Sequence, residues 1–327
     1  MYIVFNCLQT GLGNNGGTRT IINCQRVLER LGHRCDIVAT VDKFTWFHHK
    51  KPIKTIPKDA NWLIATSCTS VQSTIDFKSK IMPNKAWYIR AHETWNPKFP
   101  NDDKMGELYH KCKDAGMLMI VNSEWQKQNL EWMKIKSHII YQGLDLPLWQ
   151  NQGTRDTNKK VTIGCLYTPQ PRKRWKDFVK IADQLGTDHY KWVAYGTTSP
   201  EDELDTFIEQ PSATALCRLY SMCDIWFAPT DSEGLHNPPM EASLCGCLIV
   251  CSNNFRNGMS DYALHCTTAL VYKDISEAIQ YIKTFAKNKN NENYKQMILN
   301  SQNLIIDKIG SREKNMNKLV DLLVEHE

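Results

Sequence analysis

Strand-like apolar segments alternate with helical segments along most of the chain, and this alternation constrains the fold more than any other feature. Several strand segments are continuous apolar runs, such as 117–121 and 248–251, which are typical of strands buried on both faces of a parallel sheet. The alternation predicts an α/β, doubly wound parallel-sheet architecture. Strands are predicted at 2–8, 35–40, 62–65, 86–90, 117–121, 137–140, 161–166, 190–195, 224–228, 247–251 and 269–272, and helices at 17–31, 123–133, 173–185, 212–222 and 275–287.

A polar stretch, LPLWQNQGTRDTNKK (146–160), separates two groups of strand segments and is typical of a linker. We therefore predict two Rossmann-like domains facing a cleft, 1–146 and 147–327. A chain of 327 residues that is 42% apolar is long enough for two cores. The region 290–326 is predicted to be helical, and its last helix is expected to pack against the N-terminal domain.

The composition favours a cytoplasmic protein. No apolar run approaches the ~18 residues that a transmembrane helix needs, and the first residues, MYIVFNCLQT, carry no basic leader. Without a signal peptide or a Cys-x-x-Cys pair, the 12 cysteines are expected to be reduced thiols. No metal site is predicted.

The segment DSEGLHNPPMEASLCGCLIV (231–250) follows one predicted strand and precedes another. Within it, Asn237 followed by two prolines is typical of a helix start with Asn237 as N-cap, and a helix N-terminus favours a bound anion. Glu241, one turn in, could accept two hydrogen bonds from a ribose diol, and Glu233 could contact a sugar. The alternative is a simple strand–loop–helix connection with incidental acids.

A basic cluster follows the strand at 161–166, in the segment IGCLYTPQPRKRWKDF (163–178). A leaving diphosphate needs positive charge around it. No Asp-x-Asp pair occurs in the chain, so we expect basic side chains to take the place of a metal clamp. The alternative is an exposed basic helix start. The cluster consists of Arg172, Lys173, Arg174 and Lys176.

The segment 233–250 resembles the Glu-x7-Glu motif of glycosyltransferase family 4, a retaining GT-B family. The resemblance implies that Glu233 contacts the donor sugar and Glu241 the nucleotide ribose. It also implies that the basic cluster contacts the diphosphate, although the family's lysine is usually followed by glycine and Lys173 is followed by Arg174. The donor-binding residues that it implies are Gly16, Gly17, Arg172, Arg174, Gly234, Leu235, His236, Asn237 and Glu241, beside the catalytic candidates His92, Lys173 and Glu233.

Segments of the first half resemble the same family. YIRAHETW (88–95) resembles its His-containing loop, which implies that His92 orients the donor sugar and that Glu93 and Trp95 contact the acceptor. VNSEWQKQNL (121–130) and YQGLDL (141–146) resemble the family's Ser-x-Trp helix start and its Gly-Leu-Asp exit from the first domain. A structural role for His92 is the alternative.

The first loop, GLGNNGGTRT (11–20), contains the G-x-G-x-x-G spacing of a dinucleotide-binding loop. An NAD-dependent dehydrogenase is therefore a remote alternative. Gln9 and Thr10 separate the predicted strand from the first glycine, and only Asp42 is available as an acidic residue after the second strand. In the glycosyltransferase interpretation, this loop opens the first helix beside the substrates.

Positive charge is concentrated in the first half of the chain. Residues 1–150 contain 20 Lys and Arg against 13 Asp and Glu, whereas the remainder contains 20 against 22. The segment 43–58 carries five lysines and two histidines among Phe44, Trp46 and Phe47. This mixture suits a phosphate backbone with a stacked base, an anionic membrane surface or lipid diphosphate, or an ordinary exposed loop.

The chain also resembles compact, phage-encoded members of the family, some of which glycosylate hydroxymethylated pyrimidines in their own DNA. We therefore expect a nucleotide-sugar donor such as a UDP-sugar, no essential metal and a DNA acceptor, in the host-cell cytoplasm if the protein is phage-encoded. A saccharide or lipid-linked glycan acceptor and a non-catalytic sugar-nucleotide-binding protein are alternatives. The acceptor-binding candidates are Thr18, Arg19, Trp46, Lys50, Lys51, Glu93 and Trp95.

Overall fold

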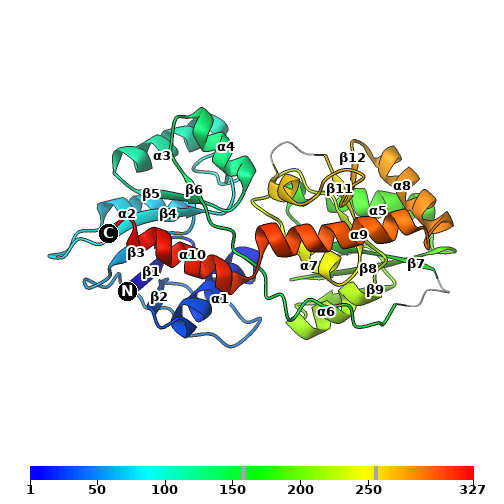
Figure 1. The fold of residues 1–327 in the computed structure, drawn as a ribbon, viewed down its shortest axis with the longest axis horizontal. Coiled ribbons are helices and arrows are strands. Elements are labelled where there is room, and N and C mark those ends of the chain that lie inside the picture. Colours follow the sequence, from blue (N-terminus) through cyan, green and yellow to red (C-terminus); the bar gives the residue numbers. More distant parts are fainter. Residues whose placement is uncertain (156–159, 254–256) are drawn as a thin grey trace. The chain divides into compact units, whose positions relative to one another are not determined.

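The chain divides into two units. A computed structural model describes residues 1–155, 160–253 and 257–327 (Figure 1). Unit 1 comprises Met1–Gly143 and Ser311–Glu327, and unit 2 comprises Leu144–Gly310. Residues 156–159 of the predicted linker lie outside the described residues.

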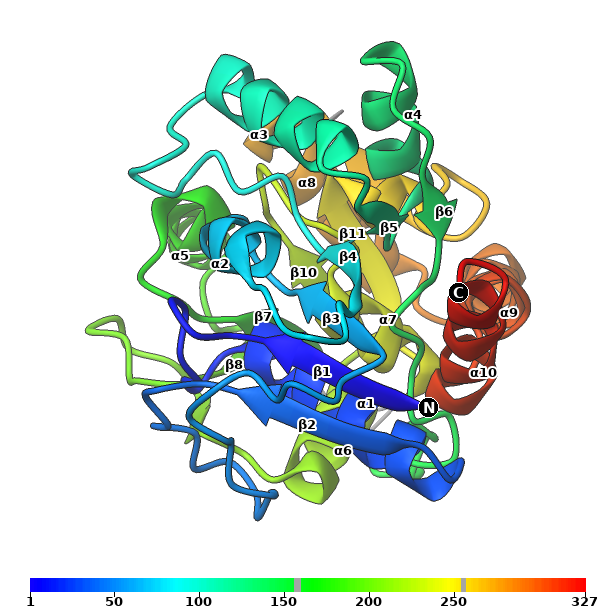
Figure 2. The same ribbon diagram turned by 90° about the vertical axis from the view of Figure 1, so that its left-hand side faces the viewer.

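Unit 1 contains a parallel sheet in the order β2-β1-β3-β4-β5-β6, whose first strands lie side by side in Figure 2. Its strands are β1 (Tyr2–Asn6), β2 (Arg34–Val38), β3 (Trp62–Ala65), β4 (Asn84–Ile89), β5 (Leu118–Val121) and β6 (His138–Ile139). Its helices are α1 (Gly16–Arg30), α2 (Val71–Asp76), α3 (Asp102–Asp114), α4 (Glu124–Trp132) and α10 (Arg312–Val324).

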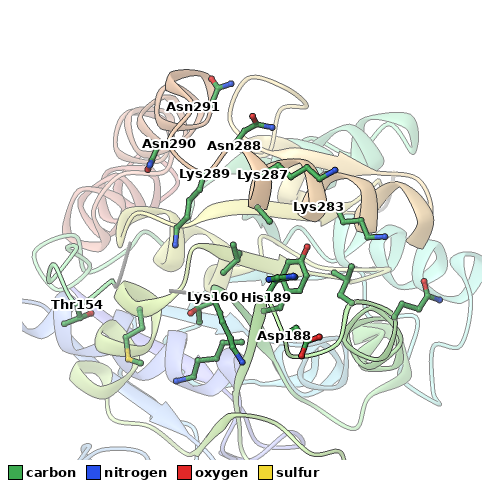
Figure 3. Close-up of a pocket in the computed structure, with 18 residues that line it drawn as sticks. Thr154, Lys160, Asp188, His189, Lys283, Lys287, Asn288, Lys289, Asn290 and Asn291 are labelled. Atoms are coloured by element: carbon green, nitrogen blue, oxygen red, sulfur yellow. The ribbon is translucent and has the colours of Figure 1, made fainter. Parts of the chain in front are cut away.

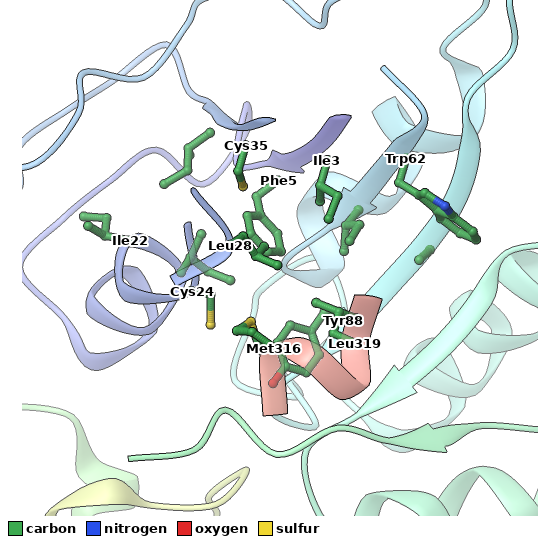
Figure 4. Packing of buried hydrophobic residues seen from close by; sticks show 14 of the residues in the cluster. Ile3, Phe5, Ile22, Cys24, Leu28, Cys35, Trp62, Tyr88, Met316 and Leu319 are labelled. Carbon is green, nitrogen blue, oxygen red and sulfur yellow. The ribbon is translucent and has the colours of Figure 1, made fainter. Parts of the chain in front are cut away.

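The two ends of the chain share the core of unit 1. Helix α1 starts where the Asn15 side chain accepts a hydrogen bond from the Thr18 backbone N–H at 2.9 Å, a typical N-cap. Its apolar face packs against β1, and Met316 and Leu319 of α10 join the same cluster (Figure 4). Burying this apolar stripe fixes α10 in unit 1.

Gly143 lies where two chain segments of unit 1 cross. Its φ is +62°, and an added Cβ would lie 2.5 Å from the Arg312 backbone. We expect Gly143→Ala to destabilise the protein by about 3 kcal/mol, since it combines backbone strain with overpacking against an immovable backbone. Gly116→Ala is the matched control, because Gly116 has a φ of +69° but open space around its Cβ position. Equal unfolding midpoints for the two variants in chemical denaturation would contradict the crossing argument.

Unit 2 contains a second parallel sheet, in the order β12-β11-β10-β7-β8-β9. Its strands are β7 (Val161–Leu166), β8 (Tyr190–Gly196), β9 (Thr206–Glu209), β10 (Ile225–Ala228), β11 (Leu248–Ser252) and β12 (Leu270–Tyr272). Its helices are α5 (Trp175–Leu185), α6 (Ala213–Met222), α7 (Asn237–Leu244), α8 (Ile275–Lys287) and α9 (Glu292–Leu304). The two parallel six-stranded sheets confirm the predicted doubly wound α/β architecture.

The strand order of unit 2 reverses at one point, between β7 and β10. Strands β8 and β9 follow β7 on one side of the sheet. The chain then returns to the other side of β7, where β10, β11 and β12 are added in sequence order. Loops that leave such neighbouring strands diverge and open a crevice at the carboxyl ends, where open α/β sheets bind ligands. The loops after β7 and β10 contain Arg172, Lys173 and Arg174 of the predicted basic cluster together with Glu233, whereas Lys176 lies in the first turn of α5.

Candidate active site

The loops after β7 and β10 bring two cations onto one carboxylate. Lys173 donates a hydrogen bond from Nζ to Glu233 Oε1, and Arg172 Nη1 lies 3.5 Å from the same oxygen. Thr230 Oγ1 also donates to Oε1, at 3.3 Å. The backbones of the loops are joined because the Asp231 N–H donates to the Arg172 carbonyl at 2.8 Å. The structure therefore brings the neighbouring residues Arg172 and Lys173 to Glu233, which lies about sixty positions later in the sequence.

The cluster carries excess positive charge in a largely buried place. The side chains of Lys173 and Glu233 are 13% and 12% exposed. Burial lowers the pKa of the Lys173 ammonium well below its usual range, and the charge of Arg172 lowers it further, while the adjacent Glu233 carboxylate opposes both effects. One carboxylate between two cations leaves capacity for an anionic ligand, and charge-assisted contacts of this kind suit a diphosphate.

Arg174 has different partners from its two neighbours. It adopts a left-handed conformation with φ 51° at the start of α5. Its guanidinium pairs with Asp177 at 2.5 Å and with Asp231 at 3.3 Å. Because two carboxylates neutralise Arg174, we expect Arg172 and Lys173 to contribute more than Arg174 to any diphosphate contact.

Helix α7 starts at Asn237, as predicted, but its N-cap is His236 and not Asn237. The two following residues are Pro238 and Pro239, which have no backbone N–H. Among the first three positions of the helix, only Asn237 therefore carries a backbone N–H. The charge that faces a ligand here comes mainly from side chains.

Glu241 lies one turn into α7 and is only 2% exposed. Its Oε2 accepts a hydrogen bond from the Tyr220 hydroxyl of α6 at 3.2 Å. The Tyr220 hydroxyl also lies 3.0 Å from the hydroxyl of Tyr195, at the end of β8. A buried carboxylate needs such partners, and these contacts fix the orientation of the Glu241 side chain.

The remaining predicted donor residues of unit 2 lie in the loop that connects Glu233 to α7. Gly234 and Leu235 are buried. His236 is buried beside Glu233, with its Nε2 3.9 Å from Glu233 Oε1. Burial lowers the pKa of His236 well below its ordinary value, and the charges of Lys173 and Arg172 act in the same direction.

In unit 1, Gly16 and Gly17 form the first residues of α1. Arg90, which follows β4 in the segment 88–95, was not among the predicted site residues. Its guanidinium donates to the Gly17 carbonyl at 2.6 Å and to the Thr66 carbonyl at 2.8 Å. Arg90 therefore joins the loop after β3 to the start of α1, next to Thr18 and Arg19. Its position after a predicted strand was the available signal.

His92 is held by two neighbours in unit 1. Its Nδ1 lies 3.0 Å from the Tyr109 hydroxyl, and its Nε2 lies 3.0 Å from Asp102 Oδ1. With a side chain that is 5% exposed, His92 can contact a sugar through Nε2 only if Asp102 is displaced. Glu93 accepts a hydrogen bond from the Cys68 N–H at 2.6 Å, while Trp95 is 43% exposed.

The aromatic residues of the segment 43–58 pack against unit 1. Phe44 is buried, and Trp46 and Phe47 are partly buried against the same core cluster. Arg26 covers the Phe47 ring at 4.4 Å. The Phe44 ring completes the core, so it is not available to stack on a base.

The lysines of this segment differ in their surroundings. Lys50 Nζ lies 2.8 Å from both Glu29 Oε1 and Asp36 Oδ1. Two carboxylates thus neutralise Lys50, which leaves it poorly placed to attract a phosphate. Lys51, the next residue, is exposed and is the better candidate for an acceptor contact.

Unit 2 also contains a pocket of about 1730 Å³ at the end of its sheet that lies opposite the cation–carboxylate cluster (Figure 3). Val161 and Tyr190, which begin β7 and β8, line it, so it lies at the amino ends of these strands. It is distinct from the cluster at the carboxyl ends. Its basic lining residues are Lys160, His189, Lys191, Lys283, Lys287 and Lys289.

The described residues contain neither a metal-binding cluster nor a membrane-spanning helix. No group of three or more His, Cys, Asp and Glu side chains among them is placed to hold a metal ion. Within the same residues, no helix has the length and apolar character needed to cross a membrane.

The two sheets define a GT-B-like fold, the architecture of the solved structures that resemble this chain. Sucrose-phosphate synthase from Thermosynechococcus elongatus has a TM-score of 0.79 at 13% identity, over 99% of this chain and 98% of that one. HepE of Anabaena in complex with UDP-glucose has a TM-score of 0.76 at 12% identity, covering 99% and 100%. An alpha-glucosyltransferase in complex with UDP has a TM-score of 0.67 at 12% identity, covering 99% and 100%. No protein-family model and no curated protein matches the sequence.

Proposed function

We propose that the protein is a retaining glycosyltransferase of the family 4 type, which moves a sugar from a nucleotide-diphosphate sugar to a hydroxyl acceptor. The observation that carries this proposal is the convergence of Arg172 and Lys173 on Glu233 at the carboxyl ends of β7 and β10. Two proteins with the same fold contain UDP-glucose or UDP, which supports a donor of this class. The cluster in unit 2 favours a transferase over the dehydrogenase suggested by the glycine spacing at 11–16.

Each group of the cluster has a proposed role. Arg172 and Lys173 stabilise the negative charge of the leaving diphosphate, Glu233 contacts the transferred sugar and Glu241 binds the ribose. The bond from the anomeric carbon to the phosphate oxygen breaks, and the acceptor oxygen bonds to the same face of that carbon. The leaving phosphate oxygen takes the acceptor proton, so no strong protein base is required. With two cations at the diphosphate, we expect transfer without an essential metal.

As acceptor we propose a hydroxymethylated pyrimidine in DNA, bound by unit 1, as in a phage-encoded enzyme acting in the host-cell cytoplasm. The excess of 20 basic over 13 acidic residues in 1–150 supports a polyanionic partner. A base in a duplex would be flipped, or its hydroxymethyl group reached through the major groove. A saccharide or lipid-linked glycan is the second candidate, which the burial of Phe44 favours because it removes one base-stacking ring.

The two acceptor classes differ in their response to salt. For DNA, the logarithm of the binding constant should fall by about 0.9 per phosphate contact for each tenfold rise in salt concentration. We expect Lys51→Ala to weaken DNA binding and to reduce that slope by about one contact, because Lys51 is exposed. Lys180→Ala is the control, since Lys180 is an exposed lysine of α5 in unit 2. Fluorescence anisotropy with hydroxymethylated duplex DNA measures the affinity and its salt dependence for each variant. An affinity that does not change with salt would favour a glycan acceptor.

A transfer assay read by mass spectrometry tests the proposed function. The purified full-length protein is incubated with a panel of nucleotide-sugars, with and without duplex DNA that contains 5-hydroxymethylcytosine. A hexose-sized mass gain on the nucleoside would establish the DNA acceptor and identify the donor. Donor hydrolysis without a gain on DNA would support a transferase with a glycan acceptor. If the protein neither turns over nor binds any donor, the proposed function is contradicted.

A further inference from the structure

The backbone of His236 is held in an unfavourable conformation at the edge of the cation–carboxylate cluster. Its φ and ψ are 60° and 83°, a left-handed region that a side chain with a Cβ rarely adopts. The hydroxyl of the buried residue Tyr262 donates to the His236 carbonyl at 2.9 Å and fixes this conformation. Such conformations persist only where the surroundings impose them, and they cluster at ligand sites.

The imidazole of His236 has one occupied nitrogen and one without a partner. Its Nδ1 lies 3.3 Å from the Met259 sulfur. Its Nε2 is buried, and among the described residues it makes no hydrogen bond. The side chain is only 6% exposed. A buried nitrogen without a partner is costly, so its position next to Glu233 indicates a ligand that supplies the missing partner.

The neighbours of the ring determine which partner it needs. A thioether sulfur only accepts hydrogen bonds, which assigns the ring proton to Nδ1 and leaves Nε2 as an acceptor. Burial and the nearby cations keep the ring neutral by lowering its pKa. An acceptor nitrogen cannot bind a diphosphate oxygen, which is also an acceptor, but it can receive a hydrogen bond from a hydroxyl.

We propose that His236 is a donor-specificity residue, whose Nε2 accepts a hydrogen bond from a hydroxyl of the transferred sugar. Glu233 Oε1 lies 3.9 Å away but already accepts from Lys173 and Thr230, so His236 Nε2 is the acceptor that lacks a partner at this point of the cluster. The site thus selects hydroxylated sugars over deoxy sugars. This inference rests on the proposed function, because it assigns the sugar end of the donor to this cluster.

Two variants of the full-length protein separate this role from a structural one. Gly and Asn both tolerate a left-handed backbone, so His236→Gly and His236→Asn should fold. Gly removes the acceptor, while the Asn amide oxygen retains one. The first step identifies which of UDP-glucose, UDP-N-acetylglucosamine, GDP-mannose and ADP-glucose binds most tightly. The probes are then that donor, its analogues that lack one hydroxyl of the sugar, and the nucleoside diphosphate without a sugar. Calorimetric titration gives each Kd, and thermal unfolding checks the fold.

We expect wild type to bind at least one monodeoxy analogue about tenfold more weakly than the parent donor. In His236→Gly this penalty should fall below about twofold, and His236→Asn should restore part of it. The nucleoside diphosphate should bind wild type and both variants alike. The inference is overturned if His236→Gly still binds the deoxy analogue as much more weakly than the parent donor as wild type does. It is also overturned if the variant loses affinity for the sugar-free nucleoside diphosphate as much as for the donor. Either result leaves the proposed function standing. Failure of wild type to bind any nucleotide-sugar overturns both.

Discussion

Lys173→Ala is expected to lower kcat by about 10²- to 10³-fold, the usual cost of removing one charge-stabilising group from a transition state. The donor KM should rise only several-fold, because the charge on the leaving diphosphate grows as its bond to the sugar breaks. Arg172 remains 3.5 Å from Glu233, so the carboxylate keeps a cation and the fold should persist. Steady-state kinetics over a range of donor concentrations separates the two constants.

Lys180→Ala is the matched control for Lys173→Ala, because Lys180 is an exposed lysine on the helix that follows the cluster. It should retain wild-type kinetics. A Lys173→Ala enzyme with wild-type kcat would show that the ammonium does not act on the leaving group. A large increase in donor KM with unchanged kcat would assign Lys173 to ground-state binding instead.

Glu241→Ala should raise the donor KM by about 50-fold while kcat at saturating donor changes little. The proposed ribose contacts are the same in the ground state and the transition state, so their loss weakens binding uniformly. Tyr220→Phe removes only the hydroxyl that donates to Glu241 Oε2, and a smaller, roughly fivefold rise is expected because the carboxylate is then less well oriented.

A ribose analogue provides the specific readout for Glu241. Wild type should bind a 2′-deoxy nucleotide-sugar more weakly than its parent, and Glu241→Ala should not distinguish the two. Because Glu241 is 2% exposed, thermal unfolding of the variant must be measured alongside. If the variant still discriminates against the deoxyribose as strongly as wild type does, the ribose role of Glu241 is wrong.

The sequence predicted the sheets well because their strands are buried on both faces. Continuous apolar runs such as 248–251 have a clear signal, and β11 lies there. β9 was missed because Thr206–Glu209 is an edge strand with half-buried and exposed residues, and its segment lacks a continuous apolar run. Strand order depends on contacts distant in sequence, so the proximity of β7 and β10 required the structure.

The candidate site could be predicted in its residue types and less well in its contacts. The motif at 231–250 indicated Glu233 and Glu241 without any geometry. The neutralisation of Lys50 by Glu29 and Asp36 depends on tertiary packing, and nothing in the segment 43–58 reports it. The left-handed backbone of His236 was equally hidden, because a histidine carries no conformational signal of the kind that a glycine does.

A crystal structure of the protein with bound UDP would show whether the carboxyl-end cluster of unit 2 is the donor site. We expect the diphosphate beside Arg172 and Lys173, with the ribose hydroxyls toward Glu241. A nucleotide seated instead among Lys160, Lys283 and Lys287, in the pocket at the amino ends of β7 and β8, would contradict this expectation.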